Sequence, residues 1–235
     1  MQLFYNQDLT SEDSEIRFTK EESRHIVKVL RKSVGDILHI TNGKGELFSA
    51  EITLADIKNC SAVIKTSEFQ EQKKYHLHLA VAPTKMNDRY EWFLEKATEI
   101  GIDEITPVFC DNSERRTIKA ERYEKILQSA MKQSLNTFLP KLNEAVPFKA
   151  FVEQEFHGQT FIAHCEDMDR SSLKSLLKPK ESVTILIGPE GDFSTQEISL
   201  ALQHQFKPVT LGDTRLRTET AAIVACHSVA YTNNV

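Results

Sequence analysis

The sequence predicts an α/β protein in which a domain with a parallel β-sheet follows a small β-rich domain. In residues 73–235, short apolar segments of strand length alternate with longer segments of helical periodicity, a pattern typical of parallel sheets. Residues 183–187 are almost entirely apolar, as expected of a strand that helices cover on both faces. Residues 1–72 instead hold several strand candidates and a single helix.

The composition is that of a globular protein with a packed core. Hydrophobic residues make up 40% of the 235 residues and charged residues 27%. The N-terminal segment lacks the basic start and apolar run of a signal peptide, and no apolar stretch approaches the roughly 18 residues of a membrane span. The four cysteines are widely separated and fit neither a zinc site nor a disulfide framework. We therefore expect a cytoplasmic protein that binds no metal and no membrane.

The formal net charge of −5 argues against a strongly cationic nucleic-acid coat. Both predicted domains, residues 1–72 and residues 73–235, are mildly acidic. If the protein binds RNA, it must use local basic patches rather than its overall field. A polar and charged segment at residues 68–74 is the expected linker between the two domains.

The N-terminal domain is predicted to be a small β-barrel or curled sheet. Residues 37–41 form a strand candidate, and the Asn42-Gly43 pair that follows is a strong hairpin signal. Apolar residues then alternate with less apolar ones between Phe48 and Leu54, as on a half-buried strand. A further strand is predicted at residues 60–66.

One helix, residues 21–32, is predicted in this domain. Its apolar residues fall on one side at helical spacing: Ile26, Val27, Val29 and Leu30. Its basic residues form a stripe on the other side: Arg24, Lys28, Arg31 and Lys32. Exposed charge is the usual state of a helix surface, so the stripe is either a solvated face or a ridge that contacts RNA phosphates.

Strands and helices are predicted to alternate in the C-terminal domain. Strands are expected at residues 76–82, 104–110, 160–165, 183–187 and 209–211. Helices are expected at residues 87–100, 121–134 and 170–177, after residue 194, and from residue 218 onward. This order of elements favours a parallel sheet with helical crossovers.

The first segment with chemical potential follows the apolar strand at residues 183–187. The strand runs into the loop Gly188-Pro189-Glu190-Gly191, and Ser194 and Glu197 then form a capping-box pattern that starts a helix. Two glycines at the carboxyl end of a parallel strand allow the backbone to approach a ligand closely. The alternative is a tight connection with no binding role. The spacing fits neither a Walker A loop nor a dinucleotide fingerprint.

The second segment spans residues 209–223. A strand ends at Leu211-Gly212, and a helix is expected to begin near Thr218. Helix capping accounts for Thr218 and Glu219, because acceptors and negative charge suit the positive end of a helix. Capping does not account for Arg217, a cation at that same end. An unfavourable charge at the carboxyl end of a strand indicates a functional site.

These two segments resemble the SPOUT class of RNA methyltransferases, and most closely the RsmE family of 16S rRNA uridine-N3 methyltransferases. The resemblance rests on the motifs at residues 187–194 and 211–222, with further agreement at residues 25–36 and 96–107. It covers nearly the whole chain. One departure is that Leu135-Asn136 follows Gln133-Ser134 where the family has an arginine soon after Gln-Ser. Lys132 and Lys141 are the candidates to take part of that arginine's role.

The resemblance implies a fold and a set of partners. The C-terminal domain would be a SPOUT domain with a trefoil knot, an exception to the rule against threaded chains, and the N-terminal domain a PUA-like RNA-binding barrel. The methyl donor would be S-adenosyl-L-methionine, bound among the knot loops without a metal. The protein would be a homodimer that acts on 16S rRNA or on the assembled small ribosomal subunit.

The resemblance also suggests the residues of the site. The expected cofactor-binding residues are Ile187, Gly188, Pro189, Glu190, Gly191, Leu211, Gly212, Leu216, Thr218, Thr220 and Ala221. The expected RNA-binding residues are Arg24, Lys28, Arg31, Lys32, Lys85 and Arg89. Methylation of uracil N3 requires the loss of the N3 proton, and negative charge then spreads onto O2 and O4. Arg217 is the candidate to stabilise this charge, and Glu190, Glu219 or solvent is the candidate proton acceptor.

Two other functions remain open on the sequence. A related SPOUT enzyme that methylates a ribose 2′-hydroxyl of rRNA or tRNA would share the knot but act on a different group. A noncatalytic RNA-binding adaptor with a decayed methyltransferase domain would belong to another class. The intact motifs at residues 187–194 and 211–222 argue against decay.

Overall fold

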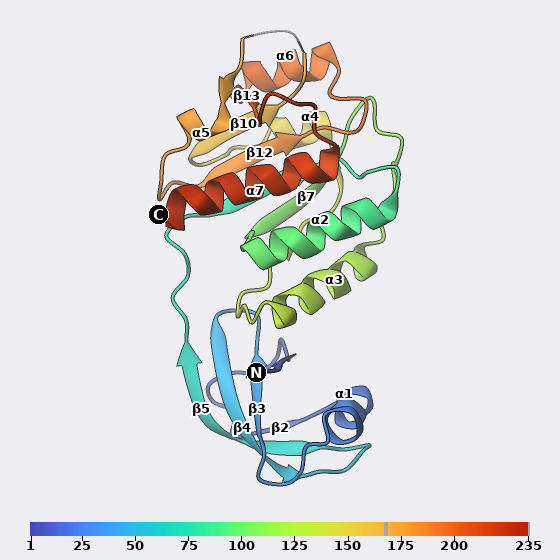
Figure 1. Ribbon diagram of the computed structural model, residues 1–235, viewed down its shortest axis with the longest axis vertical. Helices are drawn as coiled ribbons and strands as arrows, with labels where there is room; N and C mark the ends of the chain where they lie inside the picture. Colours follow the sequence, from blue (N-terminus) through green and yellow to red (C-terminus); the bar gives the residue numbers. More distant parts are fainter. Residues whose placement is uncertain (167–168, 235) are drawn as a thin grey trace. The chain divides into compact units, whose positions relative to one another are not determined.

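The computed structural model describes residues 1–166 and 169–234, which form two compact units (Figure 1). The N-terminal unit comprises Met1–Gln72 together with Met131–Leu139, and the C-terminal unit comprises Lys73–Ala130 and Pro140–Val235. Each unit has its own β-sheet and its own buried core. No helix among the described residues is long and apolar enough to cross a membrane.

The N-terminal unit contains a five-stranded sheet with the order β1-β3-β4-β5-β2. Its strands are β1 (Leu3–Tyr5), β2 (Glu15–Arg17), β3 (Ile37–Thr41), β4 (Glu46–Leu54) and β5 (Ser61–Phe69). Neighbouring strands are antiparallel except for the parallel pair β1 and β3. Phe48, Ala50 and Ile52 are buried at alternate positions of β4, and Leu54 at its end is exposed. The predicted curled β-sheet is confirmed.

The predicted hairpin joins β3 to β4 through two glycines. Gly43 has a φ of +73° and Gly45 a φ of +101°, in the left-handed region that other residues rarely adopt. A Cβ atom at Gly45 would also lie 2.6 Å from the ring of Phe138. The backbone N–H of Gly45 donates to the carbonyl of Thr137 at 3.0 Å, so the segment Met131–Leu139 packs against this turn.

The predicted helix at residues 21–32 is shorter than expected and changes its geometry. A capping box at Thr19 and Glu22 starts α1 (Lys20–Arg24), which continues as the single π-helical turn η1 (His25–Val29). The wider turn of a π-helix rotates later side chains away from their α-helical positions. Val29 was predicted to face the core, but it is 66% exposed. The left-handed φ of +55° at Arg31 then ends the helical segment.

The sheet of the C-terminal unit is parallel throughout, with the order β11-β13-β10-β12-β6-β7-β8 and with β9 beside β7. Its strands are β6 (Leu77–Val81), β7 (Glu104–Phe109), β8 (Lys141–Leu142), β9 (Val146–Pro147), β10 (Gln159–Ala163), β11 (Ser171–Ser172), β12 (Val183–Ile187) and β13 (Lys207–Thr210). Every residue of β6 and β12 is buried, as expected for central parallel strands. The predicted α/β class is confirmed.

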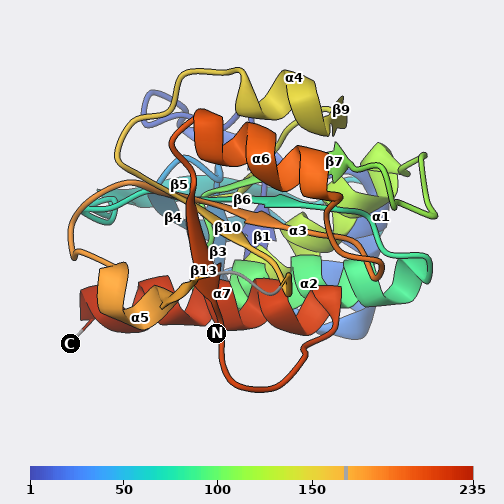
Figure 2. The same ribbon diagram turned by 90° about the horizontal axis from the view of Figure 1, so that it is seen from above.

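Helices cover both faces of this sheet. The helices of the unit are α2 (Asn87–Ile100), α3 (Ala120–Gln133), whose last turn belongs to the N-terminal unit, α4 (Phe148–Val152), α5 (Leu173–Leu176), α6 (Thr195–Gln203) and α7 (Thr218–Asn234). Figure 2 shows α4 and α6 on one face and α2 and α7 on the other. On the first face, Leu186 of β12 packs in one apolar cluster with Phe151 and Ile198.

The predicted helix at residues 170–177 is wrong in part. Ser171 and Ser172 pair with Val209 and Thr210 in the parallel sheet, so only Leu173–Leu176 remain for α5. A local sequence pattern does not reveal such a pairing, because the partner strand lies far along the chain. The trefoil knot stays a prediction.

The parallel register aligns the carboxyl ends of four strands. Ile187, the last residue of β12, pairs with Val81 of β6 on one side and with Ala163 of β10 on the other. Ala163 in turn pairs with Val209 near the end of β13. The loops that follow these strands therefore emerge at one edge of the sheet, where ligands of open α/β sheets usually bind.

His78 is a buried titratable group near the amino end of β6, at the edge of the sheet opposite these loops. Its Nε2 lies 2.7 Å from the hydroxyl of Thr106. Burial lowers the pKa of His78 from the usual 6.5 to about 4, although the nearby Glu104 carboxylate opposes this change. His76, on the same strand segment, is more exposed and lies 3.5 Å from Glu104. Both histidines therefore have identified partners within the fold.

We expect His78 to make the protein less stable in acid. Because its pKa is lower in the folded state than in the unfolded state, the unfolded chain takes up the proton first as the pH falls. Stability is therefore lost between about pH 6.5 and pH 4, by up to roughly 3 kcal/mol. In His78→Phe, urea titrations over this pH range should show a shallower loss of the free energy of unfolding. Parallel pH profiles of the two proteins would contradict the assignment.

Candidate functional site

Two adjoining cavities lie at the carboxyl edge of the parallel sheet, in the C-terminal unit. The larger has a volume of about 390 Å³, and the smaller has a volume of about 240 Å³. Both are lined by Ala163, Cys165, Arg215, Leu216 and Ala221. The cavities therefore bring together the ends of β10, β12 and β13 with the first turns of α7. This edge is the place that both sequence motifs predicted for a ligand.

The two glycines of the loop at residues 188–194 allow other residues of the protein to pack closely against the loop. A Cβ atom at Gly188 would lie 3.1 Å from the ring of Phe193, and one at Gly191 would lie 3.1 Å from Cβ of Asn112. The approach of a ligand to these glycines stays a prediction. Their missing side chains allow the loop to pack, and only Gly188 of the two lines a cavity.

Asp192 fixes this loop to the end of β10. Its φ of +64° lies in the left-handed region. One carboxylate oxygen accepts a hydrogen bond from the backbone N–H of Cys165 at 2.6 Å, and the other accepts from the N–H of Phe193 at 2.8 Å. The side-chain amide of Asn112 donates to the carbonyls of Gly191 and Asp192. The predicted capping box of Ser194 with Glu197 is confirmed and starts α6.

Glu190 has one satisfied and one unsatisfied carboxylate oxygen. Its Oε1 accepts a hydrogen bond from the backbone N–H of Lys85 at 2.9 Å. Its Oε2 is buried and has no hydrogen-bond partner among the described residues. Arg115 fixes the loop that follows β6, because its guanidinium donates to the backbone carbonyls of Thr84 at 3.0 Å and Lys85 at 2.9 Å. A buried acceptor of this kind is available to a bound molecule.

Two arginines of the second motif differ in how they are held. Arg215 lines both cavities and donates to the carbonyl of Glu190 at 3.4 Å. Arg217 lines the smaller cavity and is exposed. Within the part of the chain that the structure describes, no hydrogen bond or ion pair engages the Arg217 guanidinium. Because that guanidinium is unpaired beside a cavity, it is available to stabilise negative charge in a ligand.

Thr218 and Glu219 do more than cap α7. Thr218 is the first residue of the helix, and its buried hydroxyl donates to the carbonyl of Gly188 at 2.9 Å, which joins the two motifs. The expectation that Thr218 is the N-cap is therefore wrong. Glu219 is buried in the first turn, 3.8 Å from Nε of Arg89, and its Oε2 has no hydrogen-bond partner among the described residues. Glu219 lines neither cavity.

The structure brings most of the predicted cofactor-binding residues to the two cavities. Those that line the larger one are Leu211, Gly212, Leu216 and Ala221. Those that line the smaller one are Ile187, Gly188, Pro189, Glu190, Leu216, Thr218 and Ala221. Gly191 and Thr220 line neither. The φ of +150° at Gly212 favours glycine at that position.

Sequence analysis missed the segment that follows β10. His164, Cys165 and Arg170 line the larger cavity. His164 is only 4% exposed, and neither ring nitrogen has a hydrogen-bond partner among the described residues. The sequence predicts a strand at residues 160–165, whereas β10 ends at Ala163, and the sequence does not show that this strand lies between β12 and β13. That adjacency is what makes the segment part of the site.

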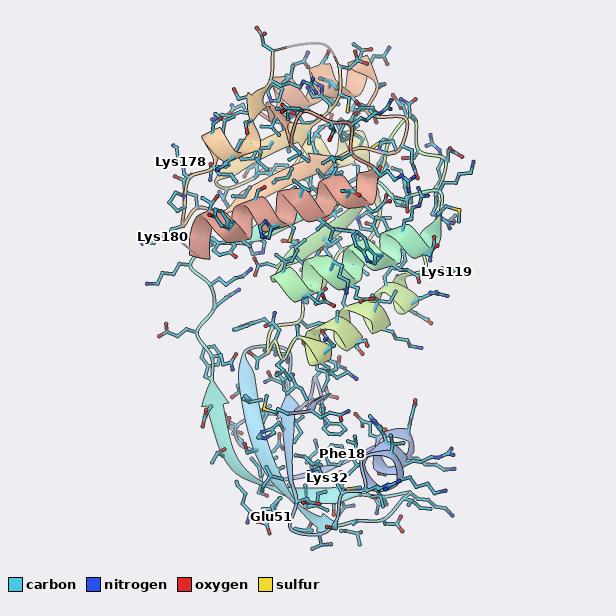
Figure 3. The ribbon with its side chains drawn as sticks, viewed as in Figure 1. Phe18, Lys32, Glu51, Lys119, Lys178 and Lys180 are labelled. Carbon is cyan, nitrogen blue, oxygen red and sulfur yellow. The ribbon has the colours of Figure 1, made fainter. Side chains whose placement is uncertain are left out.

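The predicted RNA-binding residues occur in both units. In the N-terminal unit, Arg24, Lys28 and Arg31 are exposed. Lys32, which follows the end of the helical segment and is labelled in Figure 3, is partly exposed. In the C-terminal unit, the backbone of Lys85 contacts Glu190, and its ammonium pairs with Glu114 at 2.8 Å, which raises the pKa of Lys85.

Neither of the two lysines suggested to replace the missing family arginine, Lys132 and Lys141, lines the two cavities. Lys141 pairs with Glu104 at 3.1 Å, at the amino end of β7 and thus at the edge of the sheet opposite the cavities. Lys132 lies in the last turn of α3 and is partly buried. Over residues 1–166 and 169–234, no group of three or more His, Cys, Asp or Glu side chains is arranged to hold a metal ion.

Both units match known protein families. Residues 71–230 match the family described as RNA methyltransferase domain, and residues 18–65 match the RNA methyltransferase PUA domain. A relative from Buchnera aphidicola named ribosomal RNA small subunit methyltransferase E is 32% identical over 223 residues. The alignment covers 88% of this chain and 85% of that protein.

Solved structures of similar sequence share the fold over nearly the whole chain. A crystal structure from Porphyromonas gingivalis, of a candidate rRNA methyltransferase, has a TM-score of 0.92 and 40% identity, and covers 99% of this chain and 98% of that one. A candidate methyltransferase from Legionella pneumophila, solved with the bound cofactor SAM, has a TM-score of 0.87 and 27% identity. That alignment covers 98% of this chain and 97% of the other.

Proposed function

The chain belongs to the ribosomal RNA small subunit methyltransferase E (RsmE) family, and we propose that it methylates N3 of a specific uridine in 16S rRNA with S-adenosylmethionine as the donor. The observation that carries this proposal is the pair of cavities at the sheet edge, with the unpaired guanidinium of Arg217 at the smaller one. A ribose 2′-O-methyltransferase and a noncatalytic adaptor are the alternative outcomes of the test below.

The two cavities suit a bent donor with charged and uncharged parts. Their polar lining includes buried groups that have no partner within the described protein, namely the ring of His164 and Oε2 of Glu190. Such groups are normally satisfied by a bound molecule or by water. S-adenosylmethionine, when bound, supplies a methyl group on a positively charged sulfur, so the chemistry requires no metal. The predicted cofactor-binding residues that line the cavities would hold it.

Arg217 is the proposed electrostatic catalyst. When the N3 proton of uracil is lost, negative charge develops on the two carbonyl oxygens that flank N3. A preorganised cation is most useful where such charge forms in the transition state. Arg217 is exposed at the rim of the smaller cavity, so it can meet a base that enters from outside. Its planar guanidinium presents several donors to one carbonyl oxygen.

Glu190 is the preferred proton acceptor among the candidates. It lines the same cavity as Arg217, and its buried Oε2 is unoccupied by any described hydrogen-bond donor. Glu219 lines neither cavity, and one of its oxygens faces Arg89. In this mechanism the N3 proton would move to the Glu190 carboxylate. The N3–methyl bond would form as the methyl–sulfur bond of the donor breaks, and the donor would leave as the neutral thioether S-adenosylhomocysteine.

The substrate is proposed to be 16S rRNA or the assembled small subunit, held partly by the basic stripe of the N-terminal unit. We define this stripe as Arg24, Lys28, Arg31 and Lys32. The first three are exposed, and none of the four has an ion-pair partner among the described residues. Free basic side chains on a short helical segment and directly after it suit the contact of successive phosphates.

A homodimer is proposed because α7 has an outer face that lacks charge. The 17-residue helix carries one charged residue, Glu219, and this residue is buried. On its outer side Ile223 and Val224 are partly exposed and Tyr231 is 56% exposed. Partly exposed apolar side chains on a helix with almost no charge favour a surface that another chain covers. A second copy of the chain is the proposed cover.

Nucleoside analysis after reaction tests the proposed function. Small subunits or 16S rRNA that lack the modification are incubated with the protein and methyl-labelled S-adenosylmethionine, and the RNA is digested to nucleosides. We expect the label in 3-methyluridine. Label in a 2′-O-methylated nucleoside would support the ribose methyltransferase instead, and RNA binding without any label would support the adaptor.

Arg217→Ala should lower turnover much more than donor affinity. The proposed contact forms with charge that develops during the reaction, so its loss should raise the barrier by about 2.7–4 kcal/mol, as for other preorganised contacts of this type. Single-turnover rates with saturating RNA measure the first effect, and calorimetric titration with the donor measures the second. Lys149→Ala, which removes an exposed cation on α4, serves as the control. Normal turnover of Arg217→Ala would leave the residue with a structural role only.

The basic stripe should contribute to RNA affinity and to its salt dependence. Each phosphate contact that is removed should reduce the log–log salt slope by roughly 0.7–0.9. The triple variant Arg24→Ala, Lys28→Ala, Arg31→Ala should therefore bind more weakly and with a shallower slope, at unchanged donor affinity. A matched variant with Arg17, Lys44 and Lys65 replaced by Ala carries the same change of charge elsewhere in the unit. Binding curves at several salt concentrations that superimpose for wild type and the stripe variant would indicate a merely solvated face.

A further inference from the structure

His164 is a buried polar side chain without a partner, and it lies at a cavity. It follows the last residue of β10 and lines the larger cavity. Only 4% of the residue is exposed, and no described group hydrogen-bonds to Nδ1 or Nε2. A buried polar group that is left unpaired destabilises a fold, so such groups usually serve a ligand or an ordered water.

The surroundings favour an uncharged imidazole. Burial lowers the pKa of His164, and Arg170 acts in the same direction, whereas Asp192 and Glu166 oppose this change. Arg170 also donates a hydrogen bond to the backbone carbonyl of His164, so it sits against this residue. Asp213 and Arg215 line the same cavity and bring one charge of each sign. A neutral imidazole offers one donor and one acceptor, and it suits an uncharged polar ligand group.

The smaller cavity holds the two groups assigned to the reaction, namely the unsatisfied carboxylate oxygen of Glu190 and the unpaired guanidinium of Arg217. The reacting end of the donor, with its positively charged sulfur, must therefore lie at this cavity, which leaves the larger cavity for the adenosine part. The two cavities share five lining residues, so a single bent molecule can reach both. A volume of about 390 Å³ lies in the usual range of small-molecule sites, roughly 300–1,000 Å³.

We propose that His164 is a recognition residue for the methyl donor, which it binds through a hydrogen bond to the uncharged adenosine part in the larger cavity. The sulfur that carries the methyl group then lies at the smaller cavity, where Glu190 and Arg217 meet the substrate base. This inference rests on the proposed function, because it takes S-adenosylmethionine as the ligand. It assigns a specific role to a residue that neither sequence motif contains.

Calorimetric titrations with two probes test the proposal. The probes are S-adenosylmethionine and methylthioadenosine, which has the adenosine part but no amino-acid part. In His164→Leu the affinity for both probes should fall roughly threefold to tenfold, the usual effect of one neutral hydrogen bond. In His164→Gln, which keeps a donor and an acceptor, most of the affinity should return.

Stability without ligand separates recognition from a structural role. Because the His164 ring has no partner to lose, His164→Leu should unfold at the same urea concentration as wild type or at a higher one. The matched control His78→Leu removes a buried histidine that is bonded to Thr106. It should lower the unfolding midpoint and leave the affinity for both probes unchanged.

The outcomes distinguish this inference from the proposed function. If wild type binds neither probe, the proposed function fails. If wild type binds both probes and His164→Leu binds them equally well, the role of His164 is overturned while the function stands. A loss of affinity for S-adenosylmethionine alone would place His164 at the amino-acid part and overturn the assignment to adenosine. A lower unfolding midpoint of His164→Leu would assign the residue a structural role and also overturn it.

Discussion

The parallel register of four strands is the constraint on which the candidate site depends. Val81, Ile187, Ala163 and Val209 lie in one row across β6, β12, β10 and β13. Backbone hydrogen bonds fix this row, and the packing of helices on both faces prevents a slip, since a shift by one residue would turn every side chain of a strand to the other face of the sheet. The loops after these strands therefore meet at one edge of the sheet, although Val81 and Val209 lie 128 positions apart in the sequence.

A few side-chain hydrogen bonds then convert adjacent loops into a site. Asp192 ties its loop to the backbone after β10, and Thr218 ties the start of α7 to Gly188. Arg115 holds the backbone that donates to Glu190. These hydrogen bonds pair the polar groups that hold the loops together. They leave His164 and one oxygen of Glu190 without described partners, and both of these residues line the cavities. Glu219, whose Oε2 is also unsatisfied, lines neither cavity.

The sequence patterns succeeded where the cause of structure is local. Alternating apolar residues identified β4, the helix predicted at residues 87–100 is α2, and the capping box of Ser194 and Glu197 starts α6. They failed where a distant contact or an unusual helical turn decided the outcome. The π-turn exposed Val29, and pairing with β13 drew Ser171 out of a predicted helix. The close packing of Phe193 against Gly188 is another contact that the sequence pattern does not reveal.

The sequence by itself determined the α/β class, the order of most elements and the two motifs that carry Arg217 and Glu190. These features follow from periodicity, turn residues and charge, which are properties of neighbouring positions. The tertiary structure alone decided that the segment after β10 joins the site, that Glu219 faces Arg89 instead of a cavity, and that Met131–Leu139 packs with the N-terminal unit. The physical reason is that strand order and side-chain burial arise from contacts between positions far apart in the chain, and a single sequence does not encode these contacts in any local pattern.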